Sequence, residues 1–230
     1  MLHKAIQFLR RHWHELGLIP ACGAGAYLAW SWAELGVSQR LLLLNFIVVL
    51  LHQLEEYRLP GGFPAVANLV LLRSPTPDRY PVNQNSAMVA NLVFAYGFYL
   101  LPVFYPDVIW LGLGPVLVGA AVQVVGHGIV INAKLRSLYN PGLAATLLGH
   151  VPVGAAYAYQ LTMNNSTTVR DCLLAVVYAV SFMFLNFGLL EIRILGDRNS
   201  RYPFDADEMQ RGGIAEKFAA AERRRRKPGA

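Results

Sequence analysis

The stretch LLLLNFIVVLLHQLEEY, residues 41–57, decides the fold of this chain. Its first part, residues 41–51, is almost entirely apolar and predicts a membrane helix, yet His52, Glu55 and Glu56 follow at once. Ionisable side chains inside a bilayer are costly and usually functional. At about 100° per residue, the two glutamates lie roughly 60° and 40° to either side of His52, so one helix face presents all three groups. Such a face is suited to a cation, a proton or a polar substrate.

The composition favours a membrane protein, because 55% of the 230 residues are apolar and only 15% are charged. Each of six apolar stretches is close to the length of about 17–25 residues that crosses a bilayer. We therefore predict an all-α polytopic membrane protein, with a bundle of about six transmembrane helices in residues 1–200 and a basic tail in residues 201–230. The expected spans are residues 16–33, 41–57, 87–105, 108–132, 142–162 and 171–195.

Basic residues predict the orientation, because Lys and Arg beside membrane helices tend to stay in the cytoplasm. They occur in the leader before residue 16, in the long loop 58–86, in the short loop near residue 135 and in the tail, whereas the alternate connections carry few charges. We expect a multi-pass protein of the cell membrane with both termini in the cytoplasm. The terminal block RRRRK, residues 223–227, then predicts contact with lipid headgroups, and we expect no nucleic-acid partner.

With this orientation, the strongly polar residues inside the spans all fall in the cytoplasmic half of the membrane. His127 lies near the end of the fourth span between Gly126 and Gly128, and His150 lies about eight residues, roughly 12 Å, into the fifth. A lone histidine in a helix is more often an interhelical hydrogen-bond partner than a ligand, but the common depth predicts one pocket. The set comprises His52, Glu55, Glu56, Asn91, His127, Asn132, His150, Asn186 and Glu191.

The adjacent carboxylates of Glu55 and Glu56 give the sharpest signal within this set. Two such groups cannot both stay ionised in a medium of low dielectric constant without a cation nearby. They must share a proton, bind a metal, or face Arg58 and water. The alternative interpretation is a solvated helix end just below the headgroups.

Three short motifs resemble those of the HXXEE-domain membrane proteins. His52, Glu55 and Glu56 match the motif that gives the family its name, His127 is followed five residues later by Asn132, and residues 140–142 form an Asn-Pro-Gly turn. The resemblance covers most of residues 40–195. The family is defined by motifs and topology and carries no settled reaction, so the function has to be argued from the chemical groups.

The first hypothesis is a metal-dependent membrane enzyme. Several nitrogen and oxygen donors on separate helices suit zinc or iron. The position of the pocket, in the cytoplasmic half and beside loop 58–86, predicts a lipidic or otherwise hydrophobic small substrate, with membrane lipids as neighbours and the oligomeric state left open. The candidate metal ligands are His52, Glu55, Glu56, His127 and His150; the candidate catalytic residues are Glu55, Glu56 and Asn132; and the candidate substrate-binding or outer-shell residues are Arg58, Asn91, Asn186 and Glu191.

Two other hypotheses remain open. The first is a metal-free Glu/His intramembrane protease, because the layout resembles that of the CAAX prenyl endopeptidases. That family's motif, however, requires arginine where this chain has Pro60, and asparagine four rather than five residues after histidine. The second is a proton-coupled carrier, which would use the glutamate pair as its titrating group. Against a carrier, the polar residues do not continue into the outer half of the membrane, and no inverted repeat is evident.

Overall fold

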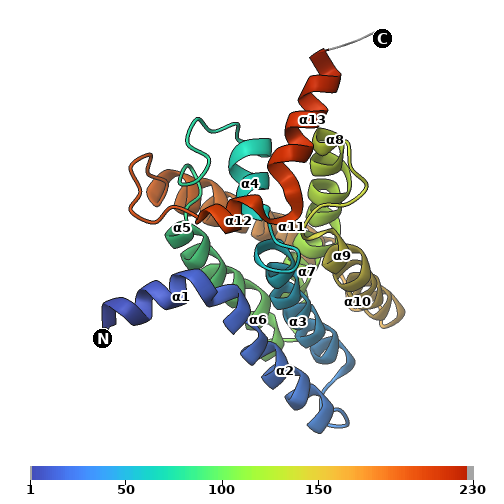
Figure 1. The fold of residues 1–230 in the computed structure, drawn as a ribbon. Helices are drawn as coiled ribbons and strands as arrows, with labels where there is room; N and C mark the ends of the chain where they lie inside the picture. Colours follow the sequence, from blue (N-terminus) through green and yellow to red (C-terminus); the bar gives the residue numbers. More distant parts are fainter. Residues whose placement is uncertain (1, 227–230) are drawn as a thin grey trace.

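A computed structural model describes residues 2–226 of the chain, and the elements within this range are all helical. Figure 1 shows a bundle in which α2, α3, α6, α7, α10 and α11 form the body. In order, the elements are α1 (Leu2–Leu16), α2 (Leu18–Trp30), α3 (Val37–Tyr57), α4 (Phe63–Ala65), η1 (Val66–Leu71), α5 (Gln84–Val89), η2 (Ala90–Ala95), α6 (Tyr96–Phe104), α7 (Ile109–Val116), η3 (Leu117–Val122), η4 (Val124–Ile131), α8 (Asn132–Leu135), α9 (Leu143–Ala145), η5 (Thr146–His150), α10 (Val151–Met163), α11 (Val169–Phe182), η6 (Met183–Ile194), α12 (Ala206–Gln210), η7 (Arg211–Gly213) and α13 (Ile214–Arg226).

Within the described residues, four continuous helices are long and apolar enough to cross a membrane: Val37–Tyr57, Gln84–Phe104, Ile109–Leu135 and Val169–Ile194. The other two expected spans differ for separate reasons. Helix α2 is apolar, but its 13 residues extend only about 20 Å. The helical run of residues 143–163 has sufficient length, but it contains His150, two tyrosines and a glutamine, which lower its hydropathy.

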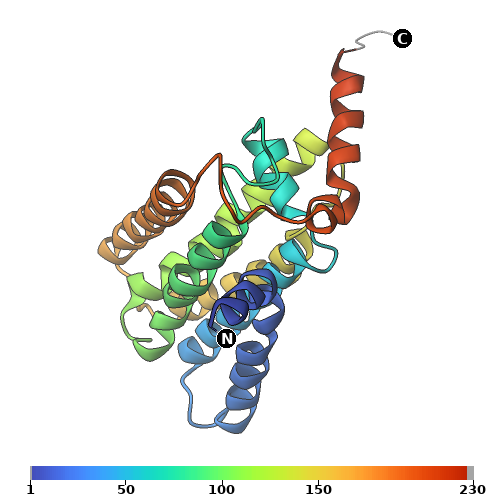
Figure 2. The same cartoon turned by 60° about the vertical axis from the view of Figure 1, so that its left-hand side comes forward.

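The apolar core explains why α3 occupies the middle of the bundle. This helix packs against α2, α6 and α10, and α7 packs against α11. In Figure 2 the long helices run side by side, with α13 projecting from one end. Lipid chains are as apolar as these side chains, so close van der Waals packing of α3 against its neighbours, rather than removal of apolar surface from water, stabilises such a bundle in a membrane. The core includes Leu42, Phe46, Leu50, Phe98, Tyr99, Val116, Tyr157 and Leu161.

The leader and the tail pack against the same end of the bundle, which we call the tail end. The leader forms a helix, α1. The guanidinium of Arg10 lies 3.7 Å from the ring centroid of Tyr202. At the other side of this end, Arg211 donates a 2.7 Å hydrogen bond to the carbonyl oxygen of Tyr57, where α3 ends. The C-terminal segment is therefore docked on this end of the bundle through Tyr202 and Arg211, and α13 projects beyond it (Figure 1).

Loop 58–86 forms part of the same cap. It contains the short helical elements α4 and η1. The side chains of Val66 and Val70 are fully buried and pack in one cluster with Ile214 and Phe218 of α13. Loop 58–86 and the tail thus cover the end of α3 that carries the His-Glu-Glu motif.

Six of the η segments have π-helical, i→i+5 hydrogen bonding, a wider winding that is rare and is often found at functional sites. Five of them carry a polar residue or glycine in or near the His-Glu-Glu region: Asn91, Gly119, His127, His150 and Glu191. The amino-acid sequence gives no sign of this winding, because hydrophobic periodicity does not distinguish it from an ordinary helix.

Candidate metal centre

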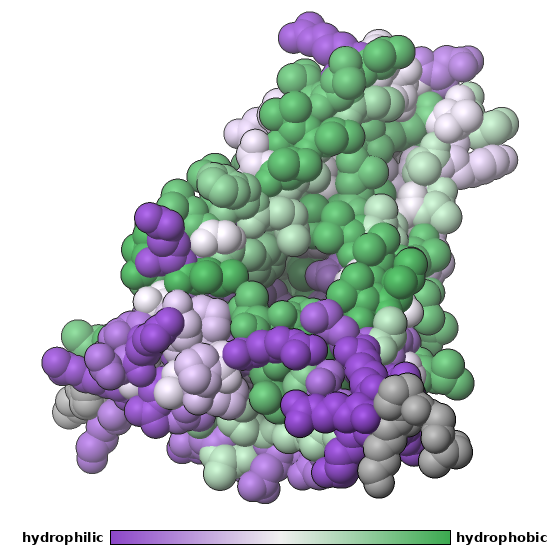
Figure 3. All heavy atoms as spheres, turned by 90° about the horizontal axis from the view of Figure 1, so that it is seen from above, coloured by the Kyte–Doolittle hydropathy of each residue, from purple (hydrophilic) through white to green (hydrophobic). Residues whose placement is uncertain are grey.

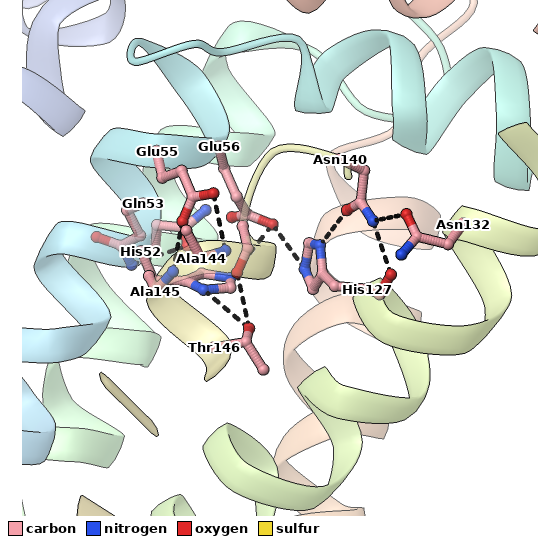
Figure 4. Close-up of polar contacts among 12 residues, drawn as sticks. His52, Gln53, Glu55, Glu56, His127, Asn132, Asn140, Ala144, Ala145 and Thr146 are labelled. Atoms are coloured by element: carbon pink, nitrogen blue, oxygen red, sulfur yellow. Dashed lines mark hydrogen bonds and ion pairs between the residues drawn. The ribbon is translucent and has the colours of Figure 1, made fainter. Parts of the chain in front are cut away.

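His52 and Glu56 of α3 and His127 of η4 converge at the tail end of the bundle (Figure 4). One carboxylate oxygen of Glu56, Oε1, lies 3.5 Å from Nε2 of His52 and 3.4 Å from Nε2 of His127. All three side chains are buried, and each offers a ligand atom within 4.8 Å of the other two. The three groups thus form a compact donor set that is shielded from solvent.

The spacing of these atoms fits a metal ion. Two ligand atoms at about 2.0–2.1 Å from a tetrahedral zinc ion are separated by about 3.3–3.4 Å. The distances from Oε1 of Glu56 to the two imidazole nitrogens, 3.5 and 3.4 Å, are close to this ligand–ligand separation. Two histidines and one carboxylate are also the ligand set of non-haem iron sites and of several hydrolytic zinc sites. The donor set therefore fits zinc or iron.

Asn140 fixes the orientation of the His127 ring. Its Oδ1 lies 2.7 Å from Nδ1 of His127, while its Nδ2 donates to the backbone carbonyl of His127 and to Oδ1 of Asn132, both at 2.7 Å. Because Nδ2 is the donor in both of these bonds, Oδ1 must accept from Nδ1 of the imidazole. Nε2 of His127 then carries the lone pair and faces Glu56. An outer-shell partner of this kind is typical of histidines that bind metals.

His52 has a similar arrangement. Oγ1 of Thr146 donates a 2.7 Å hydrogen bond to the carbonyl of Gly142, so it can only accept from Nδ1 of His52, which lies 3.5 Å away. Nε2 of His52 is buried and has no hydrogen-bond partner among the described residues. Its lone pair is therefore directed toward the same point as that of His127.

His150 stands beside the group rather than within it. Its ring centroid lies 5.6 Å from that of His52, and its Nδ1 lies 2.8 Å from Oδ1 of Asn45. Its Nε2 is buried and lacks a hydrogen-bond partner within the described chain. The compact set of three donors does not include this residue. The structure therefore places His150 beside the three converging donors and not among them.

Two glycines give the imidazoles their space. A methyl group at Gly119 would overlap the ring of His150, and one at Gly142 would overlap the ring of His127. Gly142 also has a φ of +100°, a conformation that favours glycine. By contrast, a methyl group at Gly126, next to His127 in the sequence, would meet no atom within 4 Å. The glycine that allows close approach to His127 thus comes from the Asn-Pro-Gly turn.

Glu55 is not brought into the donor set. Its two oxygens accept hydrogen bonds from the backbone N–H groups of Ala144 and Ala145, at 3.0 and 2.7 Å, and from the hydroxyl of Tyr139 at 2.8 Å. Burial and the Glu55 carboxylate raise the pKa of Tyr139, so this hydroxyl stays protonated and donates. The two glutamates of the motif have separate environments: Glu55 holds the start of α9, and Glu56 faces the histidines.

The remaining candidates lie around the group at different distances. Asn132 contacts the three converging donors only through Asn140.

Arg58 lies outside the donor set, and its Nε lies 2.6 Å from a carboxylate oxygen of Glu15 on α1. Asn91 accepts a 3.0 Å hydrogen bond from Nε2 of Gln53. Asn186, in η6, is 1% exposed and makes no side-chain hydrogen bond within residues 2–226. The role predicted for Arg58 thus has no support from its position.

A cavity of about 280 Å³ adjoins Glu56. His52, Glu56 and Glu191 contribute to its lining, and no lysine or arginine does. Figure 3 views the molecule from the tail end and shows hydrophobic side chains around a hollow in which hydrophilic atoms are visible. The charged or basic side chains of the lining are therefore limited to two carboxyl groups and one imidazole. Its apolar side chains include Val49, Leu71, Leu72, Val118, Phe182 and Phe187.

The residues that position the donors are not among the site residues predicted from the sequence. Asn45, Asn140 and Thr146 contact the outer nitrogens of the three imidazoles, and the sequence marks only Asn140, as part of the Asn-Pro-Gly turn. A threonine or asparagine in a helix carries no signal of its partner on another helix. Gly119 likewise has no feature in the sequence that points beyond helix packing.

Residues 43–157 match the family described as "Protein of unknown function with HXXEE motif". This segment contains His52, Glu56 and His127 together with Asn45, Asn140, Thr146 and His150. No curated protein and no solved structure matches the chain. The match thus covers the converging group and its hydrogen-bond partners but brings no reaction with it.

Proposed function

We propose that this chain, which belongs to the family of proteins of unknown function with an HXXEE motif, is a metal-dependent membrane enzyme that acts on an uncharged, lipid-like substrate. The observation that carries the proposal is the position of Oε1 of Glu56, 3.5 and 3.4 Å from Nε2 of two histidines. The outer nitrogens of both histidines face oxygen acceptors, so both inner nitrogens are free to bind a metal. His52, Glu56 and His127 are the proposed ligands.

The chemistry follows from this ligand set. His52, Glu56 and His127 would hold a zinc or iron ion, which would supply Lewis-acid chemistry suited to hydrolysis or oxidation. The protein's own contribution is to orient the imidazoles, to exclude bulk water and to place a base nearby. Nε2 of His150 is that base, because it is buried and unpartnered in the described chain next to His52.

The cavity supports the choice of substrate. Its lining is largely apolar and lacks lysine and arginine, so no basic side chain in it is available to pair with an anionic headgroup. Glu191 and Asn91 are polar members of the lining that can bind a hydroxyl or amide group. An uncharged amphiphile with one hydrogen-bonding group fits this surface.

The proposal includes a topology of six spans with both termini in the cytoplasm. The four apolar helices account for four spans, and α2 and residues 143–163 would supply the others. Helix α13 carries Arg223, Arg224, Arg225 and Arg226 at the end of the bundle where the tail docks. Such a basic segment favours the cytoplasmic face. The candidate centre would then lie in the inner half of the membrane.

A metal-free mechanism is the second candidate, because the same geometry also fits a proton shared between Glu56 and one of the two imidazoles. In that case Glu56 acts as a general base for hydrolysis, as in the protease-like hypothesis. Arg58 does not support a close analogy with the CAAX prenyl endopeptidases, because it pairs with Glu15 outside the cavity.

Elemental analysis of detergent-purified protein distinguishes the two candidates. We expect about one zinc or iron per chain in protein prepared without chelators, and much less in His127→Ala. The matched control is His14→Ala, which removes a buried histidine of α1 outside the donor set. Folded parent protein that binds no metal, even after incubation with zinc or ferrous iron, would contradict the metalloenzyme and favour the metal-free mechanism.

A second prediction concerns Gly142. We expect Gly142→Ala to lower zinc affinity by about tenfold or more, because the added methyl group displaces the ring of His127 from its Asn140 partner. Competition with a chromogenic chelator measures the affinity. Gly126→Ala is the control, since a methyl group there meets open space and affinity should stay unchanged. Equal affinities in both variants would show that the position of His127 does not determine binding.

A further inference from the structure

A second hollow lies on the outside of the bundle, between α6 and α11. Its volume is about 580 Å³, and it is lined by one face of the Gln84–Phe104 helix and one face of the Val169–Ile194 helix. Almost all of its side chains are apolar. Its lining includes Gly97, Phe98, Phe182 and Asn186. We call this hollow the α6/α11 groove.

The surroundings of the groove are hydrocarbon once the protein is in a bilayer. Both helices that form it are candidate membrane spans, and only 17% of the apolar window of Val169–Ile194 is buried inside the protein. Exposed side chains along the groove, such as Val93, Leu101 and Leu185, are hydrophobic. In a membrane, an open apolar groove of this kind is filled by lipid chains rather than by water.

Phe182 forms a wall shared by the groove and the cavity beside Glu56. Its ring lines both hollows and stacks on that of Phe98, with centroids 3.8 Å apart and an angle of 8° between the planes. The next residue, Met183, lines the cavity. Phe182 is half-buried, so rotation of its side chain off the Phe98 ring is the single movement that would join the two hollows.

The polar side chains of the groove are those of Tyr178, Ser181 and Asn186, and the amide of Asn186 is the buried one without a partner in the described chain. It is 1% exposed, and neither its Oδ1 nor its Nδ2 has a hydrogen-bond partner among residues 2–226. A buried amide without a partner costs about 1–3 kcal/mol, so such groups usually face a ligand or water. In a lipid-filled groove, the available partner is the hydroxyl, ester or amide group of an amphiphile.

We propose that the α6/α11 groove binds one hydrocarbon chain of an uncharged bilayer amphiphile, with Asn186 bonded to its polar group. The groove is then the route by which the amphiphile passes Phe182 and reaches the cavity beside Glu56. The role of the groove as a route rests on the proposed function, because it assumes that the substrate reacts beside Glu56. Binding in the groove itself does not require the metal.

Photocrosslinking tests the binding site. The probe is a long-chain fatty alcohol with a diazirine in its chain, added to the full-length protein in phosphatidylcholine nanodiscs, and mass spectrometry locates the adducts. We expect adducts concentrated on α6 and α11, with a loss of about fivefold or more in Gly97→Phe, which fills the groove. A methyl group at Gly97 meets no atom within 4 Å, so the change is compatible with folding. Adducts spread evenly over all membrane helices would overturn the site.

Matched variants make this result specific. Gly23→Phe on α2 is the control for bulk, because a methyl group at Gly23 also meets open space and lies outside the groove. Asn186→Leu should remove the preference for the alcohol over the corresponding diazirine alkane. His127→Ala should retain the adducts, because binding in the groove does not require the metal. Loss of metal with retained adducts therefore separates a failure of the metal centre from a failure of the groove. Equal losses in Gly97→Phe and Gly23→Phe would contradict the proposal.

Thiol labelling tests the route. Cys22 and Cys172 are free and exposed, so both are first replaced by serine, and Met183→Cys then places a thiol at the cavity. We expect Gly97→Phe to slow modification by a membrane-soluble maleimide by about tenfold, and to leave modification by a water-soluble thiosulfonate unchanged. An unchanged rate with the membrane-soluble reagent would show that access does not run through the groove.

Discussion

Glu56→Gln is expected to lower the affinity for zinc or iron by more than about 100-fold, since loss of an outer-shell partner alone commonly costs 10–100-fold. The amide is nearly isosteric with the carboxylate, so the helix and the imidazoles keep their places. It supplies no negative charge, however, and its oxygen is a poorer ligand than Oε1, which lies 3.5 and 3.4 Å from the two histidines. Chelator competition on detergent-purified protein measures the change.

The neighbouring residue provides the matched control for this experiment. Glu55→Gln changes the same chemical group one residue earlier, where the carboxylate accepts hydrogen bonds from Ala144, Ala145 and Tyr139. We expect this variant to retain metal affinity within a few-fold of the parent. If Glu55→Gln loses metal while Glu56→Gln retains it, the assignment of the two glutamates is wrong.

Glu55→Ala is expected to destabilise the fold by about 3 kcal/mol without removing the metal ligands. The variant leaves the backbone N–H groups of Ala144 and Ala145 without their acceptor at the start of α9. Hydrogen bonds to a charged acceptor contribute about 1.5–3 kcal/mol each, and part of this is regained through water. The carboxylate also interacts favourably with the positive end of the helix that continues into α10.

Thermal unfolding in detergent, followed by circular dichroism, measures this effect. Glu15→Ala is the control, because Glu15 pairs with Arg58 in a partly exposed position where ion pairs contribute about 0–1 kcal/mol. A melting temperature for Glu55→Ala equal to that of the parent would show that Glu55 does not hold the start of α9.

The sequence predicts the helical bundle well because hydrophobic runs report directly on membrane helices. The run in residues 41–57 predicts α3, which spans Val37–Tyr57. The leader is harder to interpret. Its histidines and arginines indicate a charged surface segment, whereas Trp13 and His14 are buried against Tyr57. Its helix is stabilised by contacts with distant segments, which a single sequence does not reveal.

The choice between Glu55 and Glu56 marks the limit of the sequence argument. The helical wheel places them on opposite sides of His52 at similar angles, so both are equally plausible ligands. Their roles are separated by partners on other elements: His127 for Glu56, and the start of α9 for Glu55. The lateral packing of the helices determines which partner each glutamate contacts, and hydrophobic periodicity carries no information about lateral packing.

The same limit applies to the groups behind the histidines. Asn45 lies within an apolar run and Thr146 within a helix start, and each is ordinary in its local sequence. Only the crossing of helices brings Asn45 to His150 and Thr146 to His52. The π-helical winding around these positions also has no signature in the sequence.

The metal centre can be tested by anomalous X-ray diffraction from crystals of the zinc- or iron-loaded protein, recorded on both sides of the metal absorption edge. We expect one strong peak at about 2.0–2.1 Å from Nε2 of His52, Nε2 of His127 and Oε1 of Glu56. A loaded protein with its peak elsewhere, or no peak between these three atoms, would contradict the proposed metal centre.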